Sequence, residues 1–421
     1  MRLSWNEIRH RAIAFSREWT GAKIERAEKQ TFWNEFFNLF GTRRGTRNRI
    51  ARYHFVPIIA CGAILCALAM PSLVWAEACI PSFPYSGGWL GGDGAFSIPL
   101  SNERELWLFG DTFVSADTKQ TQTRVGAGMV RNSIAISSCR GGKWTIQYHW
   151  RRPADGHNPY AVFESGTDAF YYWPLDGFLY GKTLYVALLR MSKTDSKGPF
   201  AFKLLGVDLA KIEHADEEPR NWSIRYLHLT SSEVAFPGVS IVVRPPYVWM
   251  FGVMDHPRQN RQAVILTRIS LDRLDRPAES LEYLAAGAKW RAAPIGADAE
   301  EIIAQGQAAF SVRYHPEIGK WVLVQQQPGF LSGQIGIRTS AGLEGPWSPF
   351  HSLMNEPEMR HHRTHRTRRK PIFCYGVTEH TSFESAPGTL VVTYACNGWD
   401  IRQVIADMSI YRPIVTQLPI H

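Results

Sequence analysis

The chain has 421 residues and a formal net charge of +9, a length that allows one large core or two ordinary ones. The positive charge is local: residues 1–53 hold 12 Lys/Arg against 5 Asp/Glu, whereas the chain from Glu77 onward holds 35 against 33. This distribution argues against an extended phosphate-binding surface, so no nucleic-acid partner is expected.

The first 76 residues predict a cytoplasmic basic segment followed by an export signal. Residues 1–53 mix charged and aromatic residues at helical spacing, and residues 54–76 (HFVPIIACGAILCALAMPSLVWA) carry no formal charge. About 20 apolar residues suffice to cross a bilayer, and the preceding arginines keep the N-terminus in the cytoplasm. Two interpretations stay open: a transmembrane signal anchor, or a signal peptide that is cleaved. Both place the large domain in the periplasm or outside the cell, membrane-anchored in the first case and secreted in the second.

Four cysteines follow the apolar stretch: Cys79, Cys139, Cys374 and Cys396. Four cysteines allow three pairings, and an oxidising compartment permits disulfides. We predict Cys79–Cys139 and Cys374–Cys396, because each pair is local to the first or last part of the domain. Buried free thiols are the alternative.

Residues 80–421 read as mostly β-structure, with short β-branched and aromatic runs between Gly, Pro, Asn and Asp turns. Five apolar strands recur at intervals of about 70 residues, a spacing typical of propeller blades built from four-stranded sheets. Their central residues are Trp107, Tyr185, Trp249, Trp321 and Val392. The pattern predicts an all-β fold, a five-bladed β-propeller, after the N-terminal helical and transmembrane segment. A large β-sandwich would explain five similar units less well.

The densest motif, GGWLGGDGAFSIPLSNERELWLFGDTF, carries two aspartates. A hairpin turn at residues 101–104 would place Asp93 almost opposite Asp111 or Thr112. Like charges on facing strand positions, about 5 Å apart, are destabilising. A hydrolase can use such a pair, because two carboxyl groups can hold different protonation states. The alternative is that both aspartates cap turns.

The second and last units offer further candidates. Asp176 in WPLDG precedes its strand as Asp93 does, so it is expected to approach the first pair and to complete a catalytic set. Aromatic rings near carboxylates suit stacking on sugar faces, although core packing is the alternative. The predicted substrate-binding residues are Trp89, Tyr172, Trp173 and, from the closing motif EHTSFES, His380 and Glu384.

Several motifs resemble a known family. The segments GGDGAFSIPL, LWLFGDTF, WPLDG and EHTSFESAPGTLVVTYACN resemble the bacterial domain-of-unknown-function family 4185, which is related to the endo-D-arabinanases of glycoside hydrolase family 183. The resemblance spans about residues 80–412. It implies a five-bladed propeller that hydrolyses carbohydrate, with Asp93 and Asp111 matching the paired aspartates of the family.

The paired aspartates predict a glycoside hydrolase, and the resemblance implies that it acts on a furanoside-containing, D-arabinan-like surface polysaccharide. Asp93 would act as general base or nucleophile, and Asp111 as its acid partner or as the group that tunes its pKa. Asp176 would supply the acid if Asp111 does not. No cofactor and no metal are expected, although Ca²⁺ would suit oxygen ligands such as three aspartates. A non-catalytic propeller that binds glycan or protein is the rival hypothesis.

Overall fold

A computed structural model describes residues 79–152, 159–195, 201–256, 258–329, 332–361, 371–383, 386 and 388–420. Within these ranges no helix has the length and apolarity needed to cross a membrane. The predicted basic segment, residues 1–53, and the predicted membrane span, residues 54–76, lie outside the described residues. The described residues other than Arg258–Asn260 form one compact unit.

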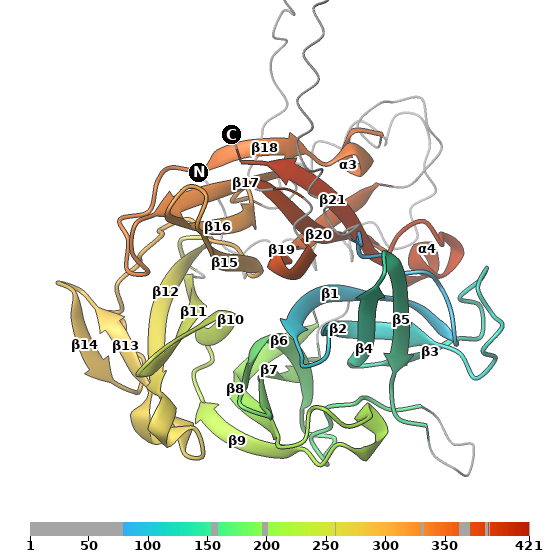
Figure 1. The fold of residues 1–421 in the computed structure, drawn as a ribbon, viewed down its shortest axis with the longest axis horizontal. Helices are drawn as coiled ribbons and strands as arrows, with labels where there is room; N and C mark the ends of the chain where they lie inside the picture. The colour runs from blue at the N-terminus through green and yellow to red at the C-terminus, as the bar shows by residue number, and fades with distance from the viewer. Residues whose placement is uncertain are drawn as a thin grey trace, which may run out of the picture. The chain divides into compact units, whose positions relative to one another are not determined.

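This unit contains five antiparallel sheets, here called blades 1–5, in chain order (Figure 1). Blade 1 contains β1 (Trp89–Pro99), β2 (Arg104–Val114), β4 (Ser133–Arg140) and β5 (Lys143–His149), with β3 (Gly128–Val130) paired to β2. Blade 2 contains β6 (Tyr171–Tyr180), β7 (Thr183–Lys193), β8 (Phe202–Ile212) and β9 (Arg225–Thr230).

Blade 3 contains β10 (Ala235–Arg244), β11 (Tyr247–His256), β12 (Arg261–Ser270), β13 (Glu282–Ala285) and β14 (Lys289–Ala292). Blade 4 contains β15 (Phe310–His315), β16 (Lys320–Gln326), β17 (Gln334–Ser340) and β18 (His351–Asn355). Blade 5 contains β19 (Ile372–Glu379), β20 (Thr389–Gly398) and β21 (Pro413–Pro419). The helices are η1 (Pro219–Asn221), η2 (Leu271–Arg273), η3 (Pro277–Ser280), α3 (Pro357–His361), η4 (Thr381–Phe383) and α4 (Ile401–Ala406).

The innermost strands close the blades into a ring, which confirms the predicted five-bladed propeller. Each first strand contacts the first strand of the next blade: β1 contacts β6, β6 contacts β10, β10 contacts β15 and β15 contacts β19. Strand β19 in turn contacts β1. Because each described sheet consists of strands consecutive in the chain, contacts between the first and last blades close the ring.

The apolar run LWLF in β2 shows why these strands are buried on both faces. Successive side chains of a strand point to opposite sides of the sheet. Leu106 and Leu108 belong to the large core that extends through blades 2 to 4, whereas Trp107 and Phe109 belong to a separate core on the other face of blade 1. Sheets packed on both faces require such continuous apolar sequence instead of strict alternation.

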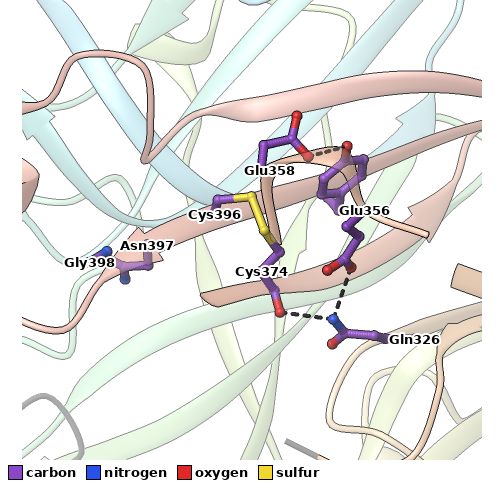
Figure 2. The surroundings of a disulfide bond; sticks show 8 residues. Gln326, Glu356, Glu358, Cys374, Cys396, Asn397 and Gly398 are labelled. Carbon is purple, nitrogen blue, oxygen red and sulfur yellow. Dashed lines mark hydrogen bonds between the residues drawn. A yellow bond between two sulfur atoms is a disulfide. The ribbon is translucent and has the colours of Figure 1, made fainter. Parts of the chain in front are cut away.

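The predicted disulfides are confirmed. Cys79–Cys139 ties the segment before β1 to β4, with an S–S distance of 2.02 Å. Cys374–Cys396 joins directly paired residues of β19 and β20, as Figure 2 shows. The first disulfide therefore stabilises blade 1, and the second stabilises blade 5.

A buried arginine secures the junction of blades 1 and 5. Arg124 is 1% exposed and donates from Nε to the Leu90 carbonyl at 2.7 Å. Its two terminal nitrogens donate to the carbonyls of Val404 at 2.6 Å and Ile410 at 2.7 Å, on either side of the loop after α4. Gly91 permits this approach, because a Cβ there would lie 2.2 Å from the Tyr411 carbonyl oxygen. The guanidinium therefore links backbone carbonyls of the first and last blades.

Arg124→Ala is expected to lower the free energy of unfolding by about 3 kcal/mol or more, because the buried carbonyls that it serves would lose their donors. Arg402→Ala is the matched control, since the Arg402 side chain is 85% exposed and pairs with Asp400. Urea unfolding followed by tryptophan fluorescence measures both. Equal stability of the two variants would show that Arg124 does not hold the ring closed.

Candidate active site

The β1–β2 hairpin brings the paired aspartates together. Asn102 and Glu103 turn the chain with positive φ angles of 62° and 57°. The register pairs Gly92 with Thr112 and then Gly94 with Phe109, so a bulge at residues 110–111 of β2 sets Asp93 opposite them. A Cβ at Gly110 would lie 2.5 Å from Asp93 Oδ1, so only glycine leaves room for that carboxyl group.

Asp93 receives a hydrogen bond from the last blade. The Tyr375 hydroxyl, on β19, donates to Asp93 Oδ2 at 2.7 Å. Burial, and secondly the charge of Asp111, raises the pKa of Asp93 to about 7, although the Tyr375 hydrogen bond opposes that shift. Asp93 is therefore the carboxyl group of the pair that retains a proton near neutral pH.

Asp111 has cationic and hydrogen-bonding neighbours that favour its charged form. Arg131 Nη1 lies 3.1 Å from Asp111 Oδ2, and the Trp173 indole donates from Nε1 to Oδ1 at 3.0 Å. Burial still raises the pKa of Asp111, and Arg131 is the strongest influence that opposes this rise. The two carboxyl groups thus interact and titrate as a pair, with Asp111 the better stabilised as an anion.

Asp111 lies at a cleft of about 280 Å³ with aromatic and basic walls. The Arg131 guanidinium stacks over the Tyr171 ring at 4.3 Å, and Trp173 meets Phe202 edge to face at 4.7 Å. Asp111 itself is 18% exposed, so its carboxylate is accessible from the cleft. The lining residues are Asp111, Arg131, Tyr171, Trp173, Lys193, Thr194, Ala201 and Phe202.

Asp176 does not join this pair in the structure. It is 1% exposed, and its Oδ2 accepts from Arg313 at 3.0 Å and from the backbone N–H of Ile241 at 2.8 Å. Its Oδ1 accepts from the Gly177 N–H at 2.8 Å. The carboxylate is thus enclosed and satisfied by blades 2, 3 and 4, and no described hydrogen bond or ion pair links it to Asp93 or Asp111.

Two of the predicted sugar-stacking residues are core residues. Trp89 is 0% exposed and stacks on Tyr148, with ring centroids 4.2 Å apart. Tyr172 is 3% exposed, donates to Asp208 Oδ2 and stacks on Tyr226. Burial leaves neither ring a face for a ligand, so the structure corrects both predictions in favour of core packing.

The other predicted binding residues differ in placement. Trp173 lines the cleft and donates a hydrogen bond to Asp111. His380 is 1% exposed and lies between Ser97 and Thr393, and burial lowers its pKa to about 3, so the ring is neutral and enclosed. This burial removes it from contact with a ligand. Glu384 lies outside the described residues.

Several residues that contact the pair were not predicted from the sequence. Arg131 follows β3, Tyr375 follows Cys374 in β19, and the Tyr411 hydroxyl donates to the Asp111 carbonyl at 3.1 Å. Tyr375 and Tyr411 lie 282 and 300 residues from their partners in the chain. No local spacing indicates such pairings, because blade closure alone brings them to the site.

One group of metal-type ligands occurs among the described residues, and it does not fit a metal ion. It consists of Glu358, Cys374 and Cys396, but the two sulfurs are bonded to each other (Figure 2). Glu358 accepts a hydrogen bond from the Tyr394 hydroxyl at 2.9 Å. Thiolate, not disulfide sulfur, is the metal ligand, so this cluster is structural.

Comparison with known proteins places the chain in a family. Residues 83–418 match the family described as a domain of unknown function, DUF5005. The chain belongs to this family. The resemblance to family 4185 and to glycoside hydrolase family 183 noted above is not confirmed by this match, and no curated protein matches the chain significantly.

The chain also shares its fold with a solved structure. A candidate hydrolase from Bacteroides ovatus superposes with a TM-score of 0.62 at 15% identity, over 79% of this chain and 86% of that one. A GH43_1 enzyme from Xanthomonas citri gives 0.43 at 12% identity over 82% and 90%. An α-L-arabinanase variant from Cellvibrio cellulosa gives 0.38 at 12% identity over 79% and 92%. At these identities the first likeness shows the fold alone, and the last two carry no argument.

Tyr375→Phe is expected to raise the pKa of Asp93 above its value of about 7, because the lost hydroxyl favours the charged carboxylate. Carboxyl ¹³C NMR titration with aspartate-labelled protein measures the shift. Tyr394→Phe, which removes a hydroxyl bonded to Glu358, is the matched control and leaves Asp93 unchanged. A lower pKa in Tyr375→Phe would contradict this account.

Asp176→Asn is expected to lower the free energy of unfolding by about 3 kcal/mol, since it leaves the partly buried Arg313 without its ion-pair partner. Asp168→Asn is the control, because Asp168 is exposed. Denaturant unfolding separates the possibilities. Unchanged stability with lost activity would instead make Asp176 a catalytic group, as the sequence predicted.

Proposed function

We propose that this chain is a glycoside hydrolase that cleaves a furanoside-containing, D-arabinan-like polysaccharide at the cell surface. The observation that carries the proposal is a pair of carboxyl groups in unlike environments, one of them in a cleft with aromatic walls. Asp93 is half-buried and accepts a hydrogen bond from Tyr375, and Asp111 interacts with Arg131 and Trp173. Environments that separate the two pKa values are the arrangement that acid–base hydrolysis needs.

In this mechanism the sequence-based roles are exchanged. Asp93, with its pKa of about 7, donates a proton to the glycosidic oxygen as general acid. Asp111 acts as the ionised carboxylate, either activating water or attacking the anomeric carbon. The rings of Trp173 and Tyr171 provide faces on which a sugar can stack. Arg131 keeps Asp111 charged while Asp93 is protonated.

The substrate class and the cellular location rest on different support. The furanoside substrate rests on the resemblance of the GGDG and FGDTF motifs to the endo-D-arabinanases, and the candidate hydrolase with the same fold agrees with hydrolysis in general. Export to the periplasm or cell exterior is supported by the two disulfides and by the apolar segment 54–76. If uncleaved, that segment would anchor the enzyme in the membrane. If it is cleaved, the enzyme would be secreted.

Asp93→Asn and Asp111→Asn are each expected to lower kcat on D-arabinan or another furanoside by about 10²–10⁴-fold, because each removes one proton-transfer or nucleophilic group. Asp168→Asn is the exposed control and retains wild-type activity. Product chromatography after digestion of a panel of furanoside polysaccharides measures this. Binding of a glycan with no hydrolysis of any member of the panel would instead identify a non-catalytic binding propeller.

The pH profile of the wild-type enzyme provides a further check on the same assignment. The acid must be protonated, so kcat/KM falls as the pH rises through the Asp93 pKa of about 7. Removing the Tyr375 hydroxyl moves this alkaline limb to higher pH. If the pH at which kcat/KM falls is the same in Tyr375→Phe as in the wild type, the general acid is another group.

A further inference from the structure

A second constellation with catalytic geometry lies on blade 2, outside the paired aspartates. His228 Nδ1 lies 3.0 Å from Asp208 Oδ1, and Ser231 Oγ lies 3.2 Å from His228 Nε2. This is the order of a serine catalytic triad. Ser231 corresponds to the nucleophile, His228 to its base, and Asp208 to the carboxylate that orients the base. Such triads recur on unrelated folds and are recognised by geometry and roles.

The carboxylate of this triad is held firmly. Asp208 is 6% exposed, and its second oxygen, Oδ2, accepts from the buried Tyr172 hydroxyl at 2.7 Å. Arg190 Nη1 lies 3.7 Å from Oδ1 and places a positive charge beside it. With Oδ2 occupied by Tyr172, Oδ1 faces the imidazole, which favours the tautomer with its proton on Nδ1 and leaves Nε2 as the acceptor.

The backbone fixes the other two members. Asp208 and His228 are paired across β8 and β9, with a register shift just before Asp208. A Cβ at Gly206 would lie 2.1 Å from the Thr230 carbonyl oxygen and 2.9 Å from Ser231 Cα, so the strand carrying Asp208 packs directly on the chain leading to Ser231. The His228 side chain is 49% exposed and Ser231 is exposed, so a substrate can reach both.

The triad shares its blade with the cleft described above. Tyr172 and Trp173 are neighbours on β6, and their side chains point to opposite faces. Tyr172 bonds Asp208 of the triad, whereas Trp173 bonds Asp111 in the cleft. Strand β8, which carries Asp208, begins at Phe202, a residue of the cleft wall.

We propose that Ser231, His228 and Asp208 form a serine esterase site that removes O-acyl groups from a saccharide. The choice of a saccharide ester as substrate rests on the proposed glycoside hydrolase function, whereas the nucleophilic triad does not. An acyl group on a sugar hydroxyl blocks a glycosidase subsite, so removal of that group on the same blade would prepare the chain for cleavage.

The reaction divides into two balanced steps. Ser231 Oγ attacks the ester carbonyl carbon while His228 Nε2 takes the hydroxyl proton; the C–O bond to the sugar then breaks, and the imidazolium returns that proton to the departing sugar oxygen. In the second step His228 Nε2 takes a proton from water, whose oxygen attacks the acyl-serine carbonyl carbon. The bond between that carbon and Ser231 Oγ then breaks, the imidazolium returns the proton to Oγ, and the carboxylic acid leaves. Asp208 accepts the Nδ1 hydrogen bond throughout and stabilises the imidazolium.

A fluorophosphonate probe and p-nitrophenyl acetate test the triad on the full-length protein. Wild type is expected to be labelled once, at Ser231 by peptide mass spectrometry, and to hydrolyse the ester. Ser231→Ala and His228→Gln are expected to lose the label and to lower ester kcat/KM by about 10³-fold. Ser223→Ala, another exposed serine on the same blade, is the control and retains both. A wild type that stays unlabelled, or label that persists in Ser231→Ala, would overturn the proposal.

Asp111→Asn separates this proposal from the glycosidase proposal. The variant is expected to lose glycan hydrolysis and to keep both labelling and ester hydrolysis, because the triad does not contact Asp111. Chemically acetylated arabinan then tests the substrate class by acetate release. Labelling of Ser231 without acetate release would refute the saccharide ester. Labelling and acetate release in the absence of any glycan cleavage would refute the glycosidase alone.

Discussion

The candidate site depends on closure of the propeller between its first and last blades. Asp93 belongs to β1, and the hydroxyl that bonds it belongs to Tyr375 of β19, the innermost strand of the last blade. The same junction is held by Arg124, whose guanidinium serves carbonyls on both sides. Because these contacts join residues almost 300 positions apart, ring closure and assembly of the site are one structural event.

Burial sets the electrostatics of the paired aspartates, and their neighbours make them unequal. Desolvation penalises the charged form of both carboxyl groups. At Asp111 a guanidinium, an indole N–H and a lysine oppose that penalty. At Asp93 a tyrosine hydroxyl and a backbone hydrogen bond oppose it, and the charge of Asp111 adds to it. The pair therefore divides into a protonated and a charged member without any difference in residue type.

The interior of the ring holds a second group of charges with a different role. Arg313 from blade 4 bonds Asp176 of blade 2 and Ser240 of blade 3, and burial raises the pKa of nearby Glu105 to about 7. Buried charges are retained where they are paired and hydrogen-bonded, and Asp176 satisfies both conditions. The innermost strands of a propeller converge, so polar side chains can link three blades there. This position explains why an aspartate that looks like Asp93 in sequence is structural in space.

Features that depend on regular spacing or on neighbouring segments of the chain could be predicted from the sequence. The five units, the turn at residues 101–104, the disulfide pairs and the proximity of Asp93 to Asp111 each follow from short spacing, a hairpin register or cysteine count. The resemblance to the endo-D-arabinanase-related family suggested a class of function. The family to which the chain belongs, DUF5005, carries no named activity.

Contacts between blades were decided by the tertiary structure. Neighbouring aromatic residues of β6 differ in exposure, since Tyr172 is buried and Trp173 lines the cleft. Trp89 of β1 is buried and stacks on Tyr148. Asp176 is paired with Arg313, 137 residues away in the chain. Asp93 is hydrogen-bonded to Tyr375, 282 residues away. Local sequence pattern fixes which residues alternate along a strand, but the face that a neighbouring blade covers, and therefore the protonation and accessibility of each side chain, is set only when the ring closes.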